Sequence, residues 1–160
     1  MKYYNSISEG YNKLHKEEQL KKLAIIKKNI KIKNSDYLLD VGCGTAFSLE
    51  HFNCKKTGVD PSIRLLKQNK KDDLIQSVGE YLPFKDDSFD IIISITAIHN
   101  FDDLKKGLRE IKRVAKDKII ISTLKRSSKN NLIEKEIMKL FKIDKIIKED
   151  KDIIYFLNKK

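Results

Sequence analysis

Apolar residues recur along this chain with two spacings, one typical of buried strands and one of amphipathic helices. Short apolar runs that end in polar or glycine-rich turns predict strands, and apolar positions every three to four residues predict helices. The predicted strands are residues 38–41, 56–60, 73–77, 89–95 and 118–123, followed by a terminal hairpin of 143–147 and 153–157. The predicted helices are residues 13–30, 47–52, 62–70, 102–116 and 131–141. This alternation predicts an α/β fold around a mostly parallel sheet.

A glycine-rich turn separates the first predicted strand from the helix that follows it. Residues 42–46 read Gly-Cys-Gly-Thr-Ala. Glycine permits positive φ and a close approach of backbone N–H groups to a ligand, and the N–H groups of a helix start favour a carboxylate or phosphate. Phe47 stands where a dinucleotide fingerprint has its third glycine, and no Lys-Ser or Lys-Thr pair follows. Both the dinucleotide fingerprint and the phosphate-binding P-loop are therefore incomplete.

The second predicted strand ends in an acidic residue, Asp60, eighteen positions after Gly42. A carboxylate can accept hydrogen bonds from two neighbouring hydroxyl groups, and an acid about 20 residues after a glycine turn is typical of ribose binding. The glycine turn and Asp60 together favour a nucleoside-containing ligand over a turn without a ligand.

Four segments resemble the class I S-adenosylmethionine-dependent methyltransferases. Residues 40–46 resemble motif I, an acid followed by G-x-G-x-G, with Ala46 at the third small position. The others are Val59-Asp60, the loop Gly79–Phe84, which is similar to G-x-A-E-x-L-P-F, and Phe89-Asp90-Ile91. The resemblance implies that S-adenosylmethionine is the cofactor and S-adenosylhomocysteine its product.

This resemblance also assigns roles to individual residues. It implies that the methionine part of the cofactor lies against Gly42, Cys43 and Gly44, that Asp40 helps to hold its ammonium group, and that Asp60 binds the ribose. The loop with Gly79 and Glu80 would border the adenine ring. The further expected contacts are Pro61 and Leu82 as apolar faces of the ring, and Thr96 at the end of the fourth strand. Val78 replaces the polar residue that often recognises adenine, which leaves the backbone of Gly79 for that contact.

The fold implied by the resemblance is a three-layer α/β/α sandwich. Its seven-stranded, mostly parallel sheet has the order 3-2-1-4-5-7-6 and ends in an antiparallel hairpin. Residues 1–160 form a single domain in this interpretation, with residues 1–35 as an N-terminal lid and helix. Tyr3, Tyr4 and Tyr11 are candidate lid residues, or alternatively the surface of a frayed terminus.

The segment Thr96–Phe101 leaves the carboxyl end of the fourth strand, where open α/β sheets bind their ligands. His99 lies in it and is the one candidate catalytic residue, either as a general base or as a histidine that only lines the pocket. No Asn/Asp-Pro-Pro motif and no cysteine follow this strand. Their absence disfavours nucleobase amino-methyltransferases and enzymes with a cysteine nucleophile.

Charge is distributed unevenly along the chain. Residues 1–104 contain 16 Lys and Arg against 15 Asp and Glu, whereas residues 105–160 contain 18 against 8. This basic region is either a surface for RNA or an acidic partner, or a lysine-rich solvated surface. Two cysteines without zinc-ligand spacing, and the absence of a long apolar run, predict a cytoplasmic protein without a metal site or membrane span.

Three functions therefore remain as hypotheses. The chain is a methyltransferase that acts on a small molecule, a methyltransferase that acts on RNA or a translation-related protein, or a non-catalytic cofactor-binding subunit that scaffolds a partner. A partner subunit that activates the chain and an aminopropyl-transferring relative are further alternatives. The sequence does not identify the methyl acceptor.

Overall fold

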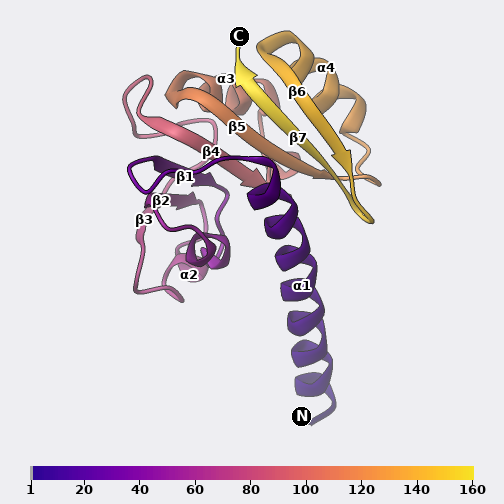
Figure 1. Cartoon of the computed structure of the whole chain (residues 1–160). Helices are drawn as coiled ribbons and strands as arrows, with labels where there is room; N and C mark the ends of the chain where they lie inside the picture. The colour runs from indigo at the N-terminus through magenta and orange to yellow at the C-terminus, as the bar shows by residue number, and fades with distance from the viewer. Residues whose placement is uncertain (1) are drawn as a thin grey trace. The chain divides into compact units, whose positions relative to one another are not determined.

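A computed structural model describes the backbone of residues 2–160 and the side chains of residues 13–160. The chain divides into two units, residues 1–32 and residues 33–160. Figure 1 shows the course of the chain through both units. The prediction of one domain over residues 1–160 stays a prediction.

The first unit is the helix α1, Lys2–Asn29. It begins eleven residues before the predicted helix, so the tyrosine-rich start of the chain has a helical backbone. The Asn29 side chain ends the helix by donating to the Ile25 carbonyl oxygen at 2.8 Å. The candidate lid side chains of Tyr3, Tyr4 and Tyr11 lie outside the described side chains.

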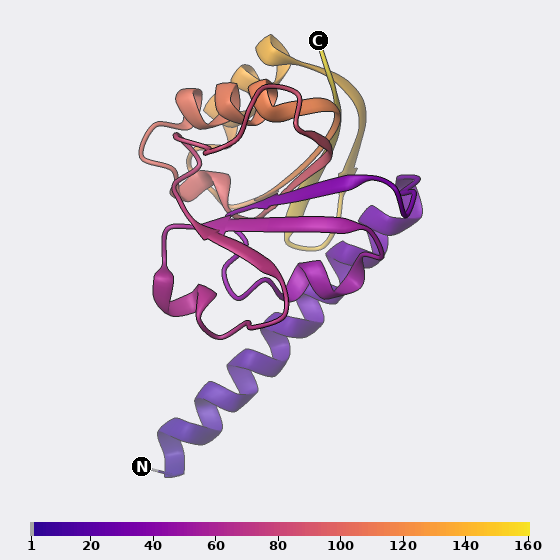
Figure 2. The same ribbon diagram turned by 90° about the vertical axis from the view of Figure 1, so that its left-hand side faces the viewer.

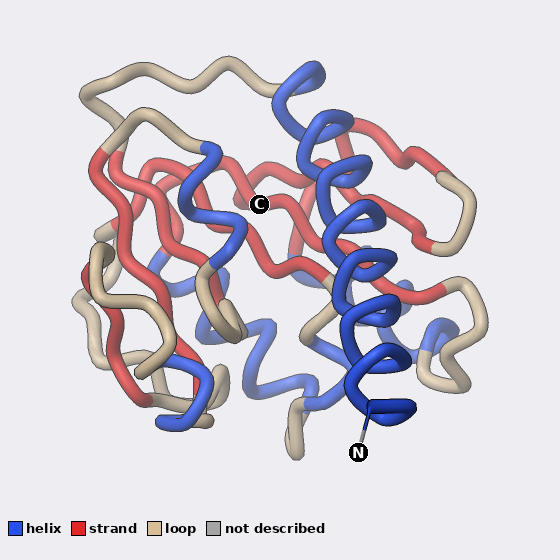
Figure 3. The backbone as a smooth tube through the Cα atoms, turned by 90° about the horizontal axis from the view of Figure 1, so that it is seen from below, coloured by secondary structure: helices blue, strands red, loops and turns tan. Residues whose placement is uncertain are grey.

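The second unit contains a seven-stranded sheet in the predicted order β3-β2-β1-β4-β5-β7-β6. Strands β1 to β5 are parallel, and β7 runs antiparallel to both β5 and β6. In Figure 3 the strands are red and the connecting loops tan. The strands are β1 (Tyr37–Val41), β2 (Lys55–Asp60), β3 (Asp73–Gln76), β4 (Phe89–Ile95), β5 (Ala115–Leu124), β6 (Phe141–Lys148) and β7 (Asp152–Lys159). The predicted fold class and terminal hairpin are confirmed.

Helices α3 (Leu104–Val114) and α4 (Asn130–Leu140) cover one face of this sheet, and the short segments η1 (Phe47–His51) and α2 (Ile63–Leu66) lie on the other side (Figure 2). The Asp103 side chain caps α3 by accepting from the Lys106 N–H at 3.0 Å. The apolar stripe of α3 packs on the buried side chains of the sheet, which stabilises the unit by removing apolar area from water. That stripe consists of Leu104, Leu108, Ile111 and Val114.

Three predicted elements are shorter or different in the structure. Residues 47–51 form a short 3₁₀ helix, and Lys56 Nζ donates to the carbonyl oxygens of Leu49 and Phe52 at its end, at 2.7 and 3.0 Å. The helix after β2 ends at Leu66 instead of residue 70. Helix α3 ends at Val114 instead of residue 116, and residues 116–117 lie in a bulge at the start of β5.

The Phe-Asp signature at the start of β4 has a structural role. Asp90 accepts a hydrogen bond from the Tyr37 N–H at 2.8 Å and pairs with Lys116 at 3.2 Å. The Tyr37 N–H is also the largest cause of the lowered pKa of this carboxyl. Asp90 thus fastens the amino ends of β1, β4 and β5, at the sheet edge opposite the predicted ligand site.

Candidate functional site

The glycine turn lies at the carboxyl end of β1, beside the loop that leaves β4. Gly42 has φ of +79°, and a Cβ atom placed there would lie 2.5 Å from Ala97 Cβ. Gly44 has φ of +58°, and such an atom there would make only an ordinary van der Waals contact with Leu65 Cδ1, at 4.0 Å. The order 2-1-4 makes the gap between β1 and β4 the point at which strand order reverses, the usual ligand position in open α/β sheets.

The N–H groups of this turn are used inside the protein. Val59 O accepts from Gly42 N at 2.8 Å and Cys43 N at 2.9 Å, and Cys43 O accepts from Ala46 N at 2.8 Å. The turn leads into one 3₁₀ turn, whose aligned peptide dipoles are few. The expectation that a helix start offers free N–H groups to an anion is therefore wrong for these three amides.

Asp60 ends β2 and holds the turn in place. Its Oδ2 accepts from Gly44 N at 2.9 Å, and its Oδ1 accepts from Ser62 N at 2.8 Å. The residue is 8% exposed. Each carboxylate oxygen can accept a second hydrogen bond, so the geometry leaves capacity for hydroxyl groups of a ligand. Pro61, the neighbouring predicted contact, is exposed.

Asp40 is more deeply buried than Asp60, with 2% exposure. Burial raises its pKa to about 7, the hydrogen bond from the Ser48 hydroxyl opposes that rise, and the charge of Asp60 adds to it. Among the residues that the structure describes, no lysine or arginine pairs with Asp40 or Asp60. Two buried carboxyls without a cation favour either protonation or a cationic ligand group.

Cys43 packs against the neighbouring strand. Gly58 of β2 leaves room for it, because a Cβ atom at Gly58 would lie 2.7 Å from Cys43 Sγ. Burial raises the pKa of the Cys43 thiol, and the charges of Asp40 and Asp60 raise it further. The thiol is therefore neutral at physiological pH and unsuited to act as a nucleophile.

The loop that was expected beside adenine is held mainly by protein contacts. Glu80 is 6% exposed and accepts from the Asp103 N–H at 3.0 Å, so its carboxylate anchors the start of α3. Leu82 is 4% exposed and belongs to the hydrophobic core, which corrects its assignment as a face for the ring. Gly79 lies against Phe101, whose Cζ would be 2.4 Å from a Cβ at that position.

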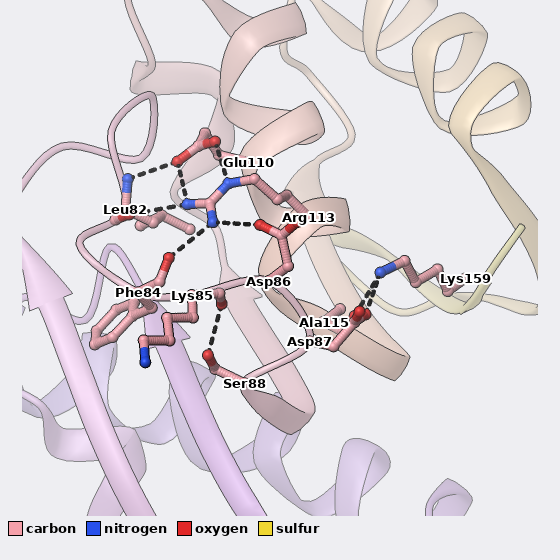
Figure 4. A network of polar contacts seen from close by, with 10 residues as sticks. All are labelled: Leu82, Phe84, Lys85, Asp86, Asp87, Ser88, Glu110, Arg113, Ala115 and Lys159. Carbon is pink, nitrogen blue, oxygen red and sulfur yellow. Dashed lines mark hydrogen bonds and ion pairs between the residues drawn. The ribbon is translucent and has the colours of Figure 1, made fainter.

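Arg113 fastens the rest of this loop to α3, as Figure 4 shows. Its guanidinium donates to the carbonyl oxygens of Leu82 and Phe84 at 3.0 and 2.7 Å and to the carboxylates of Glu110 and Asp86 at 2.7 to 2.9 Å. Glu110 also accepts from the Leu82 N–H at 2.9 Å. Hydrogen bonding to Glu110 is the largest cause of the raised pKa of Arg113. These contacts fix the path of residues 82–86.

Thr96 ends β4 in the left-handed region, with φ of +52°, which is rare for a β-branched residue. Its N–H donates to Ser122 Oγ at 2.9 Å, and its hydroxyl donates to Asp152 Oδ2 at 2.7 Å. Ser122 and Asp152 are buried in β5 and at the start of β7. The strained residue is thus held by two neighbouring strands, which fixes the start of the loop that carries Ala97 and His99.

His99 lies in a short 3₁₀ turn, η2 (Ile98–Asn100). Partial burial lowers its pKa, the nearby charge of Lys129 lowers it further, and Asp152 opposes both effects. Its Nδ1 is buried, and no described residue bonds to it. The ring is therefore neutral near pH 7, the state in which imidazole can accept a proton.

The described part of the chain has neither a cluster of metal ligands nor a membrane-spanning helix. No group of three or more His, Cys, Asp or Glu residues there could hold a metal ion, and both cysteines are free thiols. No described helix is long and apolar enough to cross a membrane.

Residues 39–121, just over half of the chain, match the methyltransferase domain family. The chain belongs to this family. The matched segment runs from β1 to β5 and so includes the glycine turn, Asp60, the loop with Gly79 and the Thr96 turn.

Individual relatives agree with the family assignment. The chain is 37% identical over 121 residues to the uncharacterized protein MJ1252 of Methanocaldococcus jannaschii, covering 72% of this chain and 47% of the relative. It is 33% identical over 106 residues to the uncharacterized methyltransferase YcgJ of Bacillus subtilis, covering 59% and 42%. The chain spans about half the length of the curated relatives that it matches.

Solved structures confirm the fold. The crystal structure of YcgJ superposes with a TM-score of 0.62 at 27% identity, covering 70% of this chain and 54% of that one. A SAM-dependent methyltransferase of Thermotoga maritima superposes with a TM-score of 0.75 at 21% identity, covering 95% and 94%. The chain therefore has the class I methyltransferase fold.

Some residues at this edge of the sheet were predicted from the sequence, and others were not. The structure brings Asp40, the glycine turn and Asp60 together and places Thr96 and His99 on the adjacent loop. Reasoning from the sequence missed Phe101, which fills the space that Gly79 and Gly107 leave open. It also missed Asp152, which is 112 residues from Asp40 along the chain and reaches this edge only through the antiparallel hairpin.

Proposed function

We propose that this chain is an S-adenosylmethionine-dependent methyltransferase domain that binds its cofactor at the carboxyl ends of β1 and β2. One observation carries the proposal: the turn at Gly44 is fastened to Asp60 and lies beside a second buried carboxyl, Asp40. Both acids lack a cationic partner among the described residues, and a Cβ atom at Gly44 would meet only Leu65 Cδ1, at 4.0 Å. A ligand with an ammonium group and vicinal hydroxyls fits this set of groups.

Each predicted contact has a role in this proposal. Asp60 would accept from the ribose hydroxyls with the oxygen lone pairs that the turn leaves unused. Asp40 would stabilise the ammonium group of the methionine part, which lies along Gly42, Cys43 and Gly44. The backbone of Gly79 and the exposed ring of Pro61 would border the adenine. Glu80 acts indirectly, because its carboxylate fixes the end of that loop to α3.

The reaction is an in-line displacement at carbon. When bound, the cofactor supplies a methyl group on a sulfonium sulfur, which leaves as a neutral thioether when the acceptor's electron pair forms the new bond. The protein's part is to position the acceptor and exclude water. His99 is the candidate base for acceptors that must lose a proton, since its lowered pKa keeps the ring neutral at working pH.

Some relatives of this chain are named for an activity other than methyl transfer, so cofactor binding and methyl transfer must be tested separately. Relatives 27–34% identical over 86–92 residues are named arginine-hydroxylase NDUFAF5, mitochondrial. These names describe those proteins, and they are a reason to measure methyl transfer directly. We retain methyl transfer because the matched family is a methyltransferase domain.

The test is calorimetric titration with S-adenosylmethionine and with S-adenosylhomocysteine. We expect micromolar binding of both by the wild-type chain, and at least about tenfold weaker binding by Asp60→Ala, which loses charge-assisted hydrogen bonds. Asp117→Ala, an exposed acid in the amino-terminal part of β5, is the matched control and should bind as the wild type does.

Circular dichroism establishes that each variant is folded. Unchanged affinity in folded Asp60→Ala would contradict the ribose assignment. Binding would justify a search for transfer of a tritiated methyl group into RNA, protein and metabolite fractions. Binding of the cofactor without transfer to any fraction would direct the search to a partner subunit.

A further inference from the structure

The loop between β5 and α4 carries three basic residues at the same sheet edge as the glycine turn. We call residues 125–129 the basic loop; it contains Lys125, Arg126 and Lys129 and no acid. It follows the carboxyl end of β5, and β5 is parallel to β4 and β1. The topology therefore brings this loop to the edge where the cofactor is proposed to bind.

A hydrogen bond connects the basic loop to the segment after β4, against which the glycine turn packs. Lys129 Nζ donates to the His99 carbonyl oxygen at 2.8 Å. His99 is two residues after Ala97, the residue against which Gly42 packs. The positive charge of Lys129 also contributes to the lowered pKa of His99. The loop thus lies across the segment that would border the methyl acceptor.

The conformation of the basic loop is fixed by neutral groups. The Asn130 side-chain amide donates to the carbonyl oxygens of Leu124 and Lys125, each at 2.8 Å. Lys125 N donates to Lys151 O at 2.9 Å, and Lys125 Nζ donates to Asp150 O at 3.2 Å. Backbone carbonyls do not cancel a full positive charge. In the described part of the chain, no carboxylate pairs with Lys125, Arg126 or Lys129.

Other basic residues of the last third differ in this respect. Carboxylates pair with several of them: Glu136 with Lys105 and Lys139, Asp90 with Lys116, Glu110 and Asp86 with Arg113, and Asp87 with Lys159. Their positive charge is largely compensated, and they belong to several different elements. A continuous basic track for RNA would need uncompensated charge along one surface. The basic loop places three such charges at the carboxyl edge of the sheet, beside the proposed cofactor site.

We propose that the basic loop binds a phosphate group of a small methyl acceptor. This inference rests on the proposed function, since it places the acceptor beside the proposed cofactor. Two ammonium groups and a guanidinium fork suit the oxygens of one or two phosphates. The neighbouring hairpin turn carries Glu149, Asp150 and Asp152, but none of these carboxylates forms an ion pair with the basic loop in the described part of the chain. Glu149 Oε1 accepts from the Lys151 and Asp152 N–H groups. The Asp152 carboxylate accepts from the Thr96 hydroxyl.

The test uses ¹⁵N-labelled full-length chain, with and without S-adenosylhomocysteine, titrated with sodium pyrophosphate at constant ionic strength. We expect saturable shifts of the amides of residues 98–100 and 124–130. The variant Lys125→Gln/Arg126→Gln/Lys129→Gln should weaken this binding by at least about tenfold, because it removes all three uncompensated charges. The control Lys135→Gln/Lys142→Gln/Lys145→Gln removes the same number of charges from α4 and β6 and should retain it.

Several outcomes would overturn the proposal. These are shifts without saturation, equal weakening in both triple variants, or equal affinity for sodium succinate, which would remove the preference for phosphate. Binding of a single-stranded RNA of about 20 nucleotides that both triple variants weaken equally would assign the surface to nucleic acid instead. Failure to bind S-adenosylhomocysteine would contradict the proposed function, whereas failure to bind pyrophosphate with intact S-adenosylhomocysteine binding would contradict this inference alone.

Discussion

Two regions lie at the edge of the sheet where its parallel strands end, an acidic end at β1–β2 and a basic end at β4–β5. They carry opposite charges and differ in burial. At the β1–β2 end, Asp40 and Asp60 are buried and lack a cation among the described residues. At the β4–β5 end, the basic loop is largely exposed, and its lysines donate to carbonyl oxygens. A buried charge without a partner is costly, so the acidic end should respond to protonation and to a bound cation. An exposed charge costs little and is screened, so the basic end should respond to salt.

Gly42 belongs to the acidic end and packs against Ala97, which follows β4 at the basic end. Of the substitutions considered, its replacement should lower the stability of the fold most. Gly42→Ala places a Cβ 2.5 Å from Ala97 Cβ at a φ of +79°, so the turn or the loop after β4 must move. We expect the free energy of unfolding to fall by about 3 kcal/mol, from left-handed strain together with overpacking. Urea denaturation measures this loss, and calorimetry should show weakened binding of S-adenosylhomocysteine.

Gly44→Ala is the matched control for that substitution. Its φ of +58° is also left-handed, but the added Cβ meets only Leu65 Cδ1 at 4.0 Å. Only the backbone cost of about 1–2 kcal/mol should remain. Equal losses for the two variants would show that contact between Gly42 and Ala97 is unimportant and that the two ends are independent.

Asp40 should make the acidic end sensitive to pH. Its pKa in the folded chain is about 7, against 3.8 for an ordinary aspartate, so the folded state binds more protons than the unfolded state between these values. Stability should therefore fall as pH rises from about 4 to 7, and Asp40→Asn should remove that fall. Denaturation at a series of pH values measures it, with the exposed Asp117→Asn as control.

Binding should depend on pH in the opposite sense. An ammonium group of the ligand favours the ionised carboxylate, so affinity for S-adenosylhomocysteine should weaken as pH falls below about 7, by up to about tenfold per pH unit. In Asp40→Asn this dependence should disappear and binding should be weaker at pH 8. A wild-type affinity that is constant from pH 6 to 8 would remove Asp40 from the ammonium site.

The two ends also differ in how far the sequence predicts them. The acidic end is encoded in local patterns: a strand, a glycine turn and an acid at a fixed spacing place Asp40, Gly44 and Asp60 together. The strand order followed from the family resemblance and the terminal hairpin from the apolar pattern, and both are confirmed. The local pattern predicted a helical segment at 47–52, but neither its 3₁₀ form nor the hydrogen bonds from Lys56 to the carbonyl oxygens of Leu49 and Phe52.

The basic end depends on tertiary contacts that no local pattern reveals. The excess of positive charge after residue 104 is visible in the sequence, but its pairing with carboxylates is not. Lys129 lies thirty residues from His99 along the chain, and only the parallel pairing of β4 and β5 brings them together. Asp152 is likewise distant from Thr96 along the chain, and the antiparallel pairing of β7 with β5 brings the two residues together.

The smallest expected effect concerns the electrostatics of the basic end. Lys129 lowers the pKa of His99, so Lys129→Gln should raise that pKa, and high salt should raise it in the wild-type chain by screening the same charge. Titration of the His99 ring signals by NMR measures both changes. Lys135→Gln, which removes an exposed charge from α4, should leave the pKa unchanged. If Lys129→Gln lowers the pKa of His99 or leaves it unchanged, the field of the basic loop does not reach the acceptor segment, and His99 would owe its neutrality to burial alone.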